Sequence, residues 1–173
     1  MIVVLMGYMG SGKSTIGKEL AKILNYEFID LDQYIEDEEL NLVSDIFSAK
    51  GEIYFRKQET KYLKKIINSS DDMVLALGGG TPCYGNNLML LANNNKVLSF
   101  YLNLSIPKLV KRLFEERENR PLISYLNSED EMQEFIGKHL FERSQFYRQA
   151  DFIINSDDKS IKDVTEKILL KLI

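Results

Sequence analysis

The chain contains one cysteine, Cys83, and one histidine, His139. A single cysteine excludes a disulfide within the chain and fits a reducing compartment, so we expect a cytoplasmic protein. These two residues are also too few for a zinc site built from cysteine and histidine. We therefore expect Cys83 to be inert and His139 to have a packing or surface role.

Long apolar runs and an excess of positive charge are also missing. No run approaches the roughly 18 apolar residues of a membrane span, so we expect no membrane segment. Met1 leads straight into an apolar segment, so we expect no signal peptide. The net charge of −4 argues against a nucleic-acid partner. No repeat or linker divides the 173 residues, of which 45% are hydrophobic, and we predict a single domain, 1–173.

Short apolar segments alternate with helical patterns along the chain. This alternation predicts an α/β protein with three layers, α/β/α, around a five-stranded parallel sheet. In such sheets, ligands bind at the carboxyl ends of the strands. The expected strands are 2–6, 26–30, 73–77, 96–102 and 151–154. The expected helices are 13–24, 33–39, 43–67 with a break at Gly51, 105–118, 129–148 and a last one that begins near Ser160.

Residues 7–14 read Gly-Tyr-Met-Gly-Ser-Gly-Lys-Ser and lie between the first expected strand and the first expected helix. This is the P-loop pattern in its required context, which predicts a site for the phosphates of a nucleoside triphosphate with Mg²⁺. The glycines let successive N–H groups turn toward an anion, and the helix adds its positive dipole end. Lys13 would reach the β- and γ-phosphates and Ser14 would ligate Mg²⁺. The alternative is a glycine-rich turn that binds nothing, but turn chemistry alone does not require Lys-Ser.

Two carboxylates, Asp30 and Asp32, follow the second expected strand. If the backbone stays extended, alternation puts them on the same side, beside the phosphate site. One could order the hydration shell of Mg²⁺ while the other faces a substrate hydroxyl, orients the attacking oxygen and accepts its proton. The Asp-x-Asp pattern leaves an alternative equally open, in which Asp32 only caps the helix 33–39.

Arg56 and Glu59 are three residues apart on one expected helix, so Glu59 can hold the guanidinium in place. A held arginine is a fork for a planar carboxylate, and the alternative is an ordinary surface ion pair. On the same stretch, Phe47 and Phe55 fit either the core or the wall of a ligand site. After the third strand, the triplet 78–80 would let a ligand touch the backbone, unless it is a plain loop.

The polar stretch 117–130 is the best candidate for a mobile lid. An arginine carried on such a segment could stabilise charge on a transferring phosphoryl group. Because Arg120 precedes Pro121, the helix should end before it and leave the arginine on a loop that can swing. The alternative is a solvated helix end, since glutamates alternate with Arg112, Arg117 and Arg120. Farther on, Arg143 is either a second carboxylate-binding arginine or a surface charge.

Together these residues resemble the shikimate kinase family, and the resemblance runs from about residue 2 to residue 154. The motifs occur in the family's order: the P-loop, Asp30-Leu31-Asp32, Ile46-Phe47 with Gly51-Glu52 and Phe55-Arg56, Gly78-Gly79-Gly80, Arg120-Pro121-Leu122, and Arg143 four residues before Tyr147. The resemblance implies a fold similar to that of adenylate kinases and the use of ATP and Mg²⁺. It also implies transfer of the ATP γ-phosphate to the 3-hydroxyl of shikimate, in the pathway to chorismate and the aromatic amino acids, by an enzyme that is usually monomeric.

The resemblance also implies a role for each matching residue. The nucleotide would be bound by Gly10, Ser11, Gly12, Lys13, Ser14, Thr15, Arg112 and Arg120, and Mg²⁺ by Ser14 and Asp30. Shikimate would be bound by Asp32, Arg56, Gly78, Gly79, Gly80 and Arg143, with Phe47, Phe55 and Glu59 beside it, and the substrate-binding helices would span about 32–67. Lys13, Asp32 and Arg120 would be the catalytic residues.

The chain departs from the family in two places. Thr81-Pro82-Cys83-Tyr84 is a less usual continuation of the glycine triplet, so the substrate-side loop is expected to differ in detail. Near the C-terminus the family often has a basic residue beside the adenine, where this chain has Asn155-Ser156-Asp157-Asp158, so backbone groups would have to make those contacts.

Two other functions compete with this interpretation. A gluconate-type or nucleoside-monophosphate kinase would share the fold, but a nucleotide acceptor would need a base pocket, and this chain has two separated arginines and a glycine triplet instead. A catalytically idle binding module would have lost Lys13, Asp32 or Arg120, and all three are present.

Overall fold

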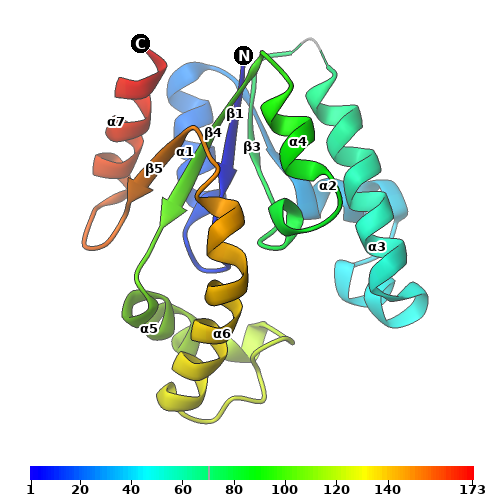
Figure 1. Ribbon diagram of the computed structural model, residues 1–173, viewed down its shortest axis with the longest axis vertical. Helices are drawn as coiled ribbons and strands as arrows, with labels where there is room; N and C mark the ends of the chain where they lie inside the picture. Colours follow the sequence, from blue (N-terminus) through cyan, green and yellow to red (C-terminus); the bar gives the residue numbers. More distant parts are fainter. Residues whose placement is uncertain (70) are drawn as a thin grey trace.

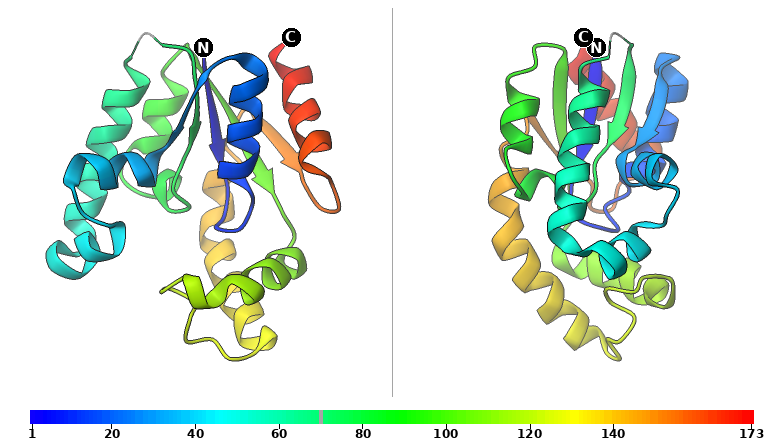
Figure 2. Two further views of the ribbon diagram at one scale, coloured as in Figure 1. Left: turned by 180° about the vertical axis from the view of Figure 1, so that it is seen from behind. Right: turned by 90° about the vertical axis from the view of Figure 1, so that its right-hand side faces the viewer.

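The computed structural model describes residues 1–69 and 71–173, in which five parallel strands form one sheet in the order β2-β3-β1-β4-β5. Helices cover both faces of this sheet (Figures 1 and 2). The strands are β1 (Ile2–Met6), β2 (Glu27–Asp30), β3 (Met73–Ala76), β4 (Val97–Asn103) and β5 (Phe152–Asn155). Each expected strand is therefore confirmed, and so is the three-layer α/β/α architecture.

The helices are α1 (Lys13–Leu24), α2 (Leu31–Glu39), α3 (Val43–Ile67), α4 (Asn87–Ala92), α5 (Ile106–Glu116), α6 (Glu129–Tyr147) and α7 (Ile161–Leu172). Short 3₁₀ turns, η1 (Thr81–Cys83) and η2 (Arg117–Asn119), follow the third strand and α5. The expected helices are confirmed with shifts of one or two residues at their ends. The short helix α4 was not expected, because its single apolar stretch lies between asparagine-rich turns.

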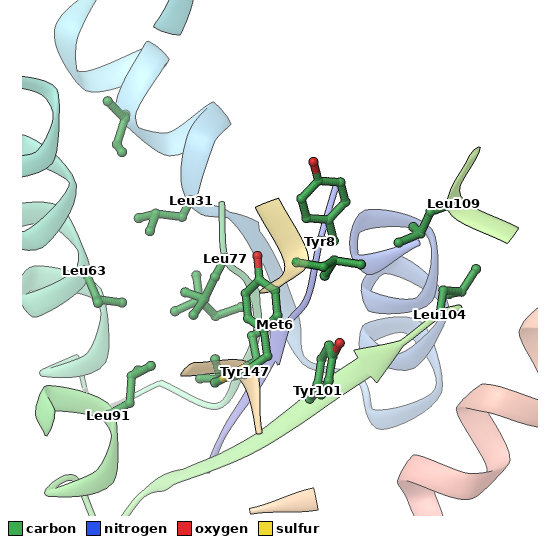
Figure 3. Packing of buried hydrophobic residues seen from close by; sticks show 14 of the residues in the cluster. Met6, Tyr8, Leu31, Leu63, Leu77, Leu91, Tyr101, Leu104, Leu109 and Tyr147 are labelled. Atoms are coloured by element: carbon green, nitrogen blue, oxygen red, sulfur yellow. The ribbon is translucent and has the colours of Figure 1, made fainter. Parts of the chain in front are cut away.

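The central strand β1 is buried on both faces, as its unbroken apolar sequence requires. Val3 and Leu5 pack with the inner faces of α1 and α7. The alternate residues, Met6 among them, belong to the larger cluster on the opposite face, with side chains from α3, α4 and α6. Figure 3 shows Tyr147 and Tyr101 close to Met6 in this cluster. The strand order makes β1 the neighbour of both β3 and β4, so the loop that follows β1 emerges at the centre of the sheet.

The long helix α3 is two helices joined at Gly51, as the sequence predicts. Gly51 has φ 79° and ψ 170°, a conformation that the other residue types rarely adopt. The change of direction there separates the short first helix from the long one that carries Arg56.

The end of α5 also matches the prediction. The helix ends at Glu116, and Arg120 is extended, with φ −128° and ψ 98°, because it precedes Pro121. The stretch 117–130 is not free of the core, however, since Ile123 and Leu126 are buried. Figure 1 shows α5, α6 and the chain between them beyond the carboxyl ends of the strands.

The first turn of α7 is stabilised as expected. Ser160 accepts a hydrogen bond from the N–H of Asp163, and the Asp163 carboxylate accepts one from the N–H of Ser160. Within the described part of the chain, none of the helices combines the length and the apolar character that crossing a bilayer requires.

Candidate active site

A cavity of about 550 Å³ lies at the carboxyl ends of the strands. Its wall is formed by the P-loop, the start of α2, the first two residues of the glycine triplet, α5, Arg120 and the loop before α7. The lining residues are Met9–Ile16, Asp30, Asp32, Leu77–Gly79, Arg112, Glu116, Arg120, Ser156, Lys159–Ile161 and Val164. Every residue that the sequence predicts to bind the nucleotide or Mg²⁺ therefore lines one cavity. These residues are Gly10–Thr15, Asp30, Arg112 and Arg120.

The P-loop curls around the amino group of Lys13. Gly12 caps α1 in the left-handed region, with φ 92° and ψ 14°, so a residue with a side chain would be strained there. The Lys13 Nζ donates hydrogen bonds to the carbonyl oxygens of Gly7 (2.9 Å) and Tyr8 (3.0 Å). Burial lowers the pKa of Lys13 to about 8, although the carboxylates of Asp32 and Asp30 oppose this shift.

Asp30 connects the P-loop helix to the start of α2. Its Oδ2 accepts a hydrogen bond from the Ser14 hydroxyl at 2.7 Å, and its Oδ1 accepts one from the N–H of Asp32 at 3.1 Å. Asp30 is therefore the cap of α2, and the alternative that Asp32 caps this helix is wrong. Asp32 lies in the first turn of the helix, so the expected extended Asp-x-Asp is wrong as well.

Asp32 is half-buried beside Lys13 and the glycine triplet. Burial raises the pKa of Asp32 to about 6, and the carboxylates of Asp30 and Glu59 act in the same direction. The positive charges of Lys13 and Arg56 oppose this shift. Asp32 thus lies within electrostatic reach of both the P-loop lysine and the arginine of α3.

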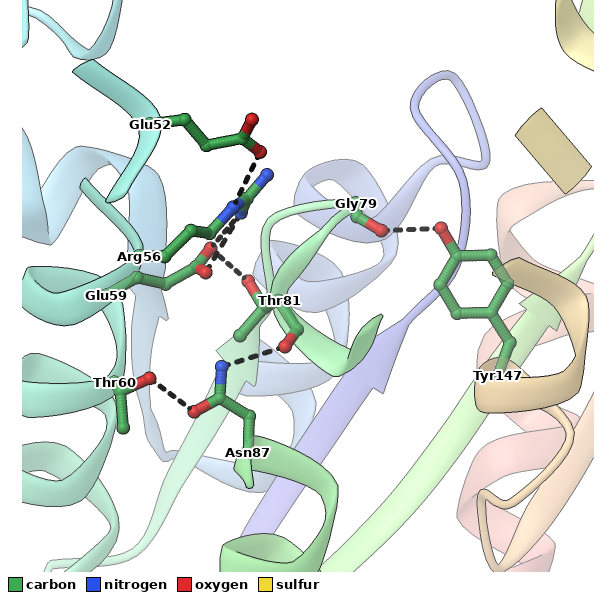
Figure 4. A network of polar contacts seen from close by, with 8 residues as sticks. All are labelled: Glu52, Arg56, Glu59, Thr60, Gly79, Thr81, Asn87 and Tyr147. Atoms are coloured by element: carbon green, nitrogen blue, oxygen red, sulfur yellow. Dashed lines mark hydrogen bonds and ion pairs between the residues drawn. The ribbon is translucent and has the colours of Figure 1, made fainter. Parts of the chain in front are cut away.

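Arg56 is held by a buried carboxylate. Its Nη1 donates to both oxygens of Glu59, at 3.1 and 2.9 Å, and its Nε donates to Glu52 at 3.4 Å (Figure 4). Glu59 is only 1% exposed and also accepts a hydrogen bond from the Thr81 hydroxyl at 2.7 Å. The surface-ion-pair alternative is therefore wrong, and Arg56 is a preorganised guanidinium.

Phe47 and Phe55 pack together beside this arginine, with ring centroids 4.5 Å apart. Phe55 is buried in the main cluster and Phe47 packs against that cluster. The Arg56 Cζ lies 5.2 Å from the Phe55 ring and 5.9 Å from the Phe47 ring. Both rings thus belong to the core while also forming the wall behind Arg56.

The three glycines each approach a different element. A Cβ atom on Gly78 would lie 2.7 Å from Oδ1 of Asp32, and one on Gly80 would lie 2.7 Å from Nη2 of Arg56. The nearest atom to a Cβ on Gly79 would be the P-loop nitrogen of Met9, at 3.5 Å. The triplet is therefore the meeting point of α2, α3 and the P-loop, and a contact between its backbone and a ligand stays a prediction.

Helix α6 brings Arg143 to the same loop from the other side. The Tyr147 hydroxyl donates to the carbonyl oxygen of Gly79 at 2.5 Å (Figure 4). Burial raises the pKa of Cys83 to about 11, against the opposing charges of Arg143 and Arg56. Cys83 therefore stays protonated, and the two arginines, far apart in sequence, both act on this one side chain.

His139 has the packing role expected for it. Its ring lies 4.3 Å from that of Phe135, and its Nδ1 shares a hydrogen bond of 3.1 Å with the hydroxyl of Tyr8. Tyr8 belongs to the P-loop, so this contact fastens α6 to the phosphate-binding loop. The sequence reasoning did not find it, because nothing local to Tyr8 or His139 indicates the partner.

Arg112 and Arg120 line the cavity. The Arg112 Nη1 donates to the carbonyl oxygen of Gly10 at 3.2 Å. The Arg120 Nε and Nη2 donate to Glu116, at 3.1 and 2.7 Å. Arg117 is not a lining residue, because its guanidinium turns back onto the carbonyl oxygen of Phe114.

The loop before α7 supplies a residue that the sequence analysis missed. Lys159 lines the cavity directly after the acidic stretch 155–158, so a basic side chain is available where only backbone groups were expected. The preceding Asp157 accepts a hydrogen bond from the N–H of Ser105 at 2.9 Å, which fixes this loop to the start of α5.

Comparisons with known proteins place these features in one family. The family model described as shikimate kinase matches residues 9–173. A curated shikimate kinase of Flavobacterium psychrophilum is 45% identical over 166 residues, which cover 96% of this chain and 95% of that protein. The solved structure of shikimate kinase from Bacteroides thetaiotaomicron is similar with a TM-score of 0.90 at 33% identity, covering 99% of this chain and 98% of the other. Shikimate kinase from Acinetobacter baumannii, solved in complex with shikimate, has a TM-score of 0.85 at 31% identity, covering 99% and 92%.

Proposed function

The chain belongs to the shikimate kinase family, and we propose that it transfers the γ-phosphate of ATP to the 3-hydroxyl of shikimate, giving shikimate 3-phosphate and ADP. One observation carries the assignment of roles: Asp32 lies within electrostatic reach of both Lys13 and Arg56. In this assignment Lys13 binds the phosphates of ATP and Arg56 binds the carboxylate of the substrate. Asp32, between them, would hold a hydroxyl of the substrate in position to attack the γ-phosphate. The reaction belongs to the pathway to chorismate and the aromatic amino acids.

The triphosphate would be bound by Lys13 and by the backbone N–H groups of residues 10–15. The Ser11 hydroxyl supports this role, since it is buried and has no hydrogen-bond partner within residues 1–69 and 71–173. The hydroxyl would donate a hydrogen bond to a phosphate oxygen. Arg112 at the rim would pack against the adenine, with Lys159 on the other side of the cavity.

Ser14 and Asp30 suit Mg²⁺, which prefers oxygen ligands and keeps several water molecules. Their side chains are joined by a hydrogen bond, so a cation at the Ser14 hydroxyl would have the Asp30 carboxylate beside its hydration shell. Among the described residues, no group of three or more His, Cys, Asp or Glu side chains could hold a metal ion. The proposed site therefore depends on water and phosphate oxygens for its remaining ligands. When bound, Mg²⁺ would neutralise charge on the β- and γ-phosphates.

Asp32 would orient the attacking hydroxyl and accept its proton. A pKa of about 6 keeps its carboxyl group ionised at neutral pH while making it a stronger base than an ordinary aspartate. Arg56 and Arg143 would hold the carboxylate of shikimate, and the N–H groups of the glycine triplet would contact its hydroxyls. Glu59 would act through Arg56, because Arg56 and Thr81 already take up its two oxygens.

One segment beside the site would close over it as a lid during catalysis. We assign the lid to residues 117–130, with Arg120 exchanging Glu116 for the ATP phosphates, and the substrate-binding helices to about 32–67, within one kinase domain. Closure would exclude water from the γ-phosphate. We also propose that the enzyme is a cytoplasmic monomer, as the family and the single cysteine indicate.

A coupled assay of ADP release with shikimate, gluconate and AMP as acceptors tests the function. The expected result is ATP-dependent turnover with shikimate alone, lost when Mg²⁺ is chelated. Turnover with gluconate or AMP but not shikimate would assign the chain to another kinase activity. Absence of turnover with all three, in a protein that still binds ATP, would favour the idle binding module.

A further inference from the structure

The turn that follows the glycine triplet places an aromatic ring on Arg56. The centroid of the Tyr84 ring lies 3.9 Å from the Arg56 Cζ, closer than either phenylalanine ring. We propose that Tyr84 is a positioning residue, which holds the Arg56 guanidinium in the orientation that binds the substrate carboxylate. This inference rests on the function proposed above. A cation over an aromatic face at this distance is attracted by the ring's negative face.

The hydrogen bonds of Arg56 leave one nitrogen for a ligand. Glu59 accepts from Nη1 and Glu52 accepts from Nε. Among the described residues, none accepts a hydrogen bond from Nη2. These contacts engage Nε and Nη1, and the Tyr84 ring, whose centroid is 3.9 Å from Cζ, lies against the guanidinium that carries the remaining nitrogen.

The turn that carries Tyr84 is fixed by a buried hydrogen-bond network, although the Tyr84 side chain is itself 36% exposed. Asn87 donates to the carbonyl oxygen of Thr81 at 2.9 Å and accepts from the Thr60 hydroxyl at 2.8 Å (Figure 4). Thr81 and Asn87 are both fully buried. The N–H of Cys83 also donates to the carbonyl oxygen of Gly80 at 2.8 Å, which closes the turn. The backbone from which the ring extends is therefore anchored between the glycine triplet and α4.

The structure also has open space beside Arg56 and Tyr84. A second cavity, of about 580 Å³, lies along α3 and is lined by Arg56 and Tyr84 together with Ile53, Lys57 and their neighbours. It is separate from the nucleotide cavity, whose lining does not include Arg56. Removing the Tyr84 ring would enlarge this second cavity and let the guanidinium turn into it, away from Asp32 and the glycine triplet.

The experiment compares Tyr84→Leu, which removes the ring, with Tyr84→Phe, which keeps it. For Tyr84→Leu we expect the KM for shikimate to rise about fivefold to thirtyfold, with the KM for ATP unchanged. Tyr84→Phe should stay within about twofold of the wild type, because the hydroxyl is not part of the interaction. Phe141→Leu, which removes an aromatic ring that is 86% exposed on α6, is the matched control.

A double-mutant cycle separates positioning from a merely structural effect. In an Arg56→Ala background, Tyr84→Leu should cause no further loss of shikimate affinity, measured by calorimetry, and the melting temperatures should show that each variant is folded. The inference is overturned if Tyr84→Leu leaves the KM for shikimate unchanged, if Tyr84→Phe is as impaired as Tyr84→Leu, or if ATP binding weakens equally. A wild-type enzyme without shikimate turnover would instead contradict the proposed function, so the two failures are distinguishable.

Discussion

The guanidinium of Arg56 lies directly on the backbone of Gly80. A Cβ atom at this glycine would be 2.7 Å from Nη2, 2.9 Å from Nη1 and 3.1 Å from Cζ. Gly80 itself has φ −90° and ψ −18°, a conformation that alanine adopts without strain. The absence of a side chain at Gly80 is therefore required by the arginine rather than by the turn.

Gly80→Ala should displace Arg56 without unfolding the protein. We expect the KM for shikimate to rise by about tenfold to a hundredfold, since a displacement of about 1 Å in a binding group has effects of this size. The KM for ATP should change little. Gly137→Ala is the matched control, because a Cβ there would meet nothing within 4 Å and alanine favours the helix. Unchanged shikimate kinetics in Gly80→Ala would show that Arg56 does not bind the substrate.

The raised pKa of Asp32 determines where kcat/KM for shikimate should fall at low pH. Because burial raises its pKa to about 6, kcat/KM for shikimate should fall as the pH drops through about 6 rather than through 4. The raised pKa also means that the folded state binds more protons than the unfolded state between about pH 4 and 6, so ionised Asp32 destabilises the fold above pH 6. Asp32→Asn should therefore abolish turnover yet increase the free energy of unfolding at pH 7.5 by about 1–3 kcal/mol. An acid limb near pH 4 would contradict the role of Asp32 as the base.

Lys13→Ala should remove the point charge that we propose binds the β- and γ-phosphates. We expect kcat/KM to fall at least about 10²-fold, the scale of losing one preorganised electrostatic group, with an unchanged circular dichroism spectrum. In the wild type, kcat/KM for ATP should decline above about pH 8, where the buried amine of the free enzyme loses its proton. A variant that keeps more than half of the wild-type rate would rule out the P-loop assignment.

Arg143→Lys should weaken shikimate binding far more than ATP binding. Lysine keeps the charge but loses the planar fork that grips a carboxylate with two hydrogen bonds. Arg148→Lys is the control, since Arg148 lies exposed at the end of the same helix. Dissociation constants for both ligands, measured by calorimetry, provide the test. Equal losses for shikimate and ATP would point to a nucleotide role or to damage to α6.

Arg120→Ala should lower kcat more than it weakens shikimate binding, because its proposed phosphate contact forms only when the lid closes. Hydrogen exchange should show weak protection of residues 117–122 in the free enzyme and stronger protection with ATP and shikimate. Residues 123–126 should be better protected throughout, since Ile123 and Leu126 are buried. High protection of 117–122 that ligands leave unchanged would contradict the lid, although the kinase assignment would stand.

The fold could be predicted from the sequence because its signals are local. Each strand contains a short apolar segment, and the P-loop pattern lies directly between β1 and α1. The break at Gly51 and the helix end before Arg120 follow from backbone conformations that glycine and the residue before proline prefer. A parallel sheet then brings the ends of its strands together, which is why Lys13 and Asp32 could be assigned to one site.

The sequence could not predict how side chains from distant segments pair. Asp30 rather than Asp32 caps α2, because the choice depends on where the strand ends in three dimensions. Three contacts join segments that only the packed fold brings within reach. They are the hydrogen bonds of Tyr147 to Gly79 and of Tyr8 to His139, and the contact of the Tyr84 ring with Arg56. The amino-acid sequence by itself determined the strands, the helices other than α4, and the types of reactive groups, since these depend on neighbouring residues. The tertiary structure alone decided the orientation of Arg56 and the pKa of Asp32. The pKa depends on burial and on charges contributed by α1, β2 and α3, and the orientation depends on contacts with Glu52, Glu59 and Tyr84.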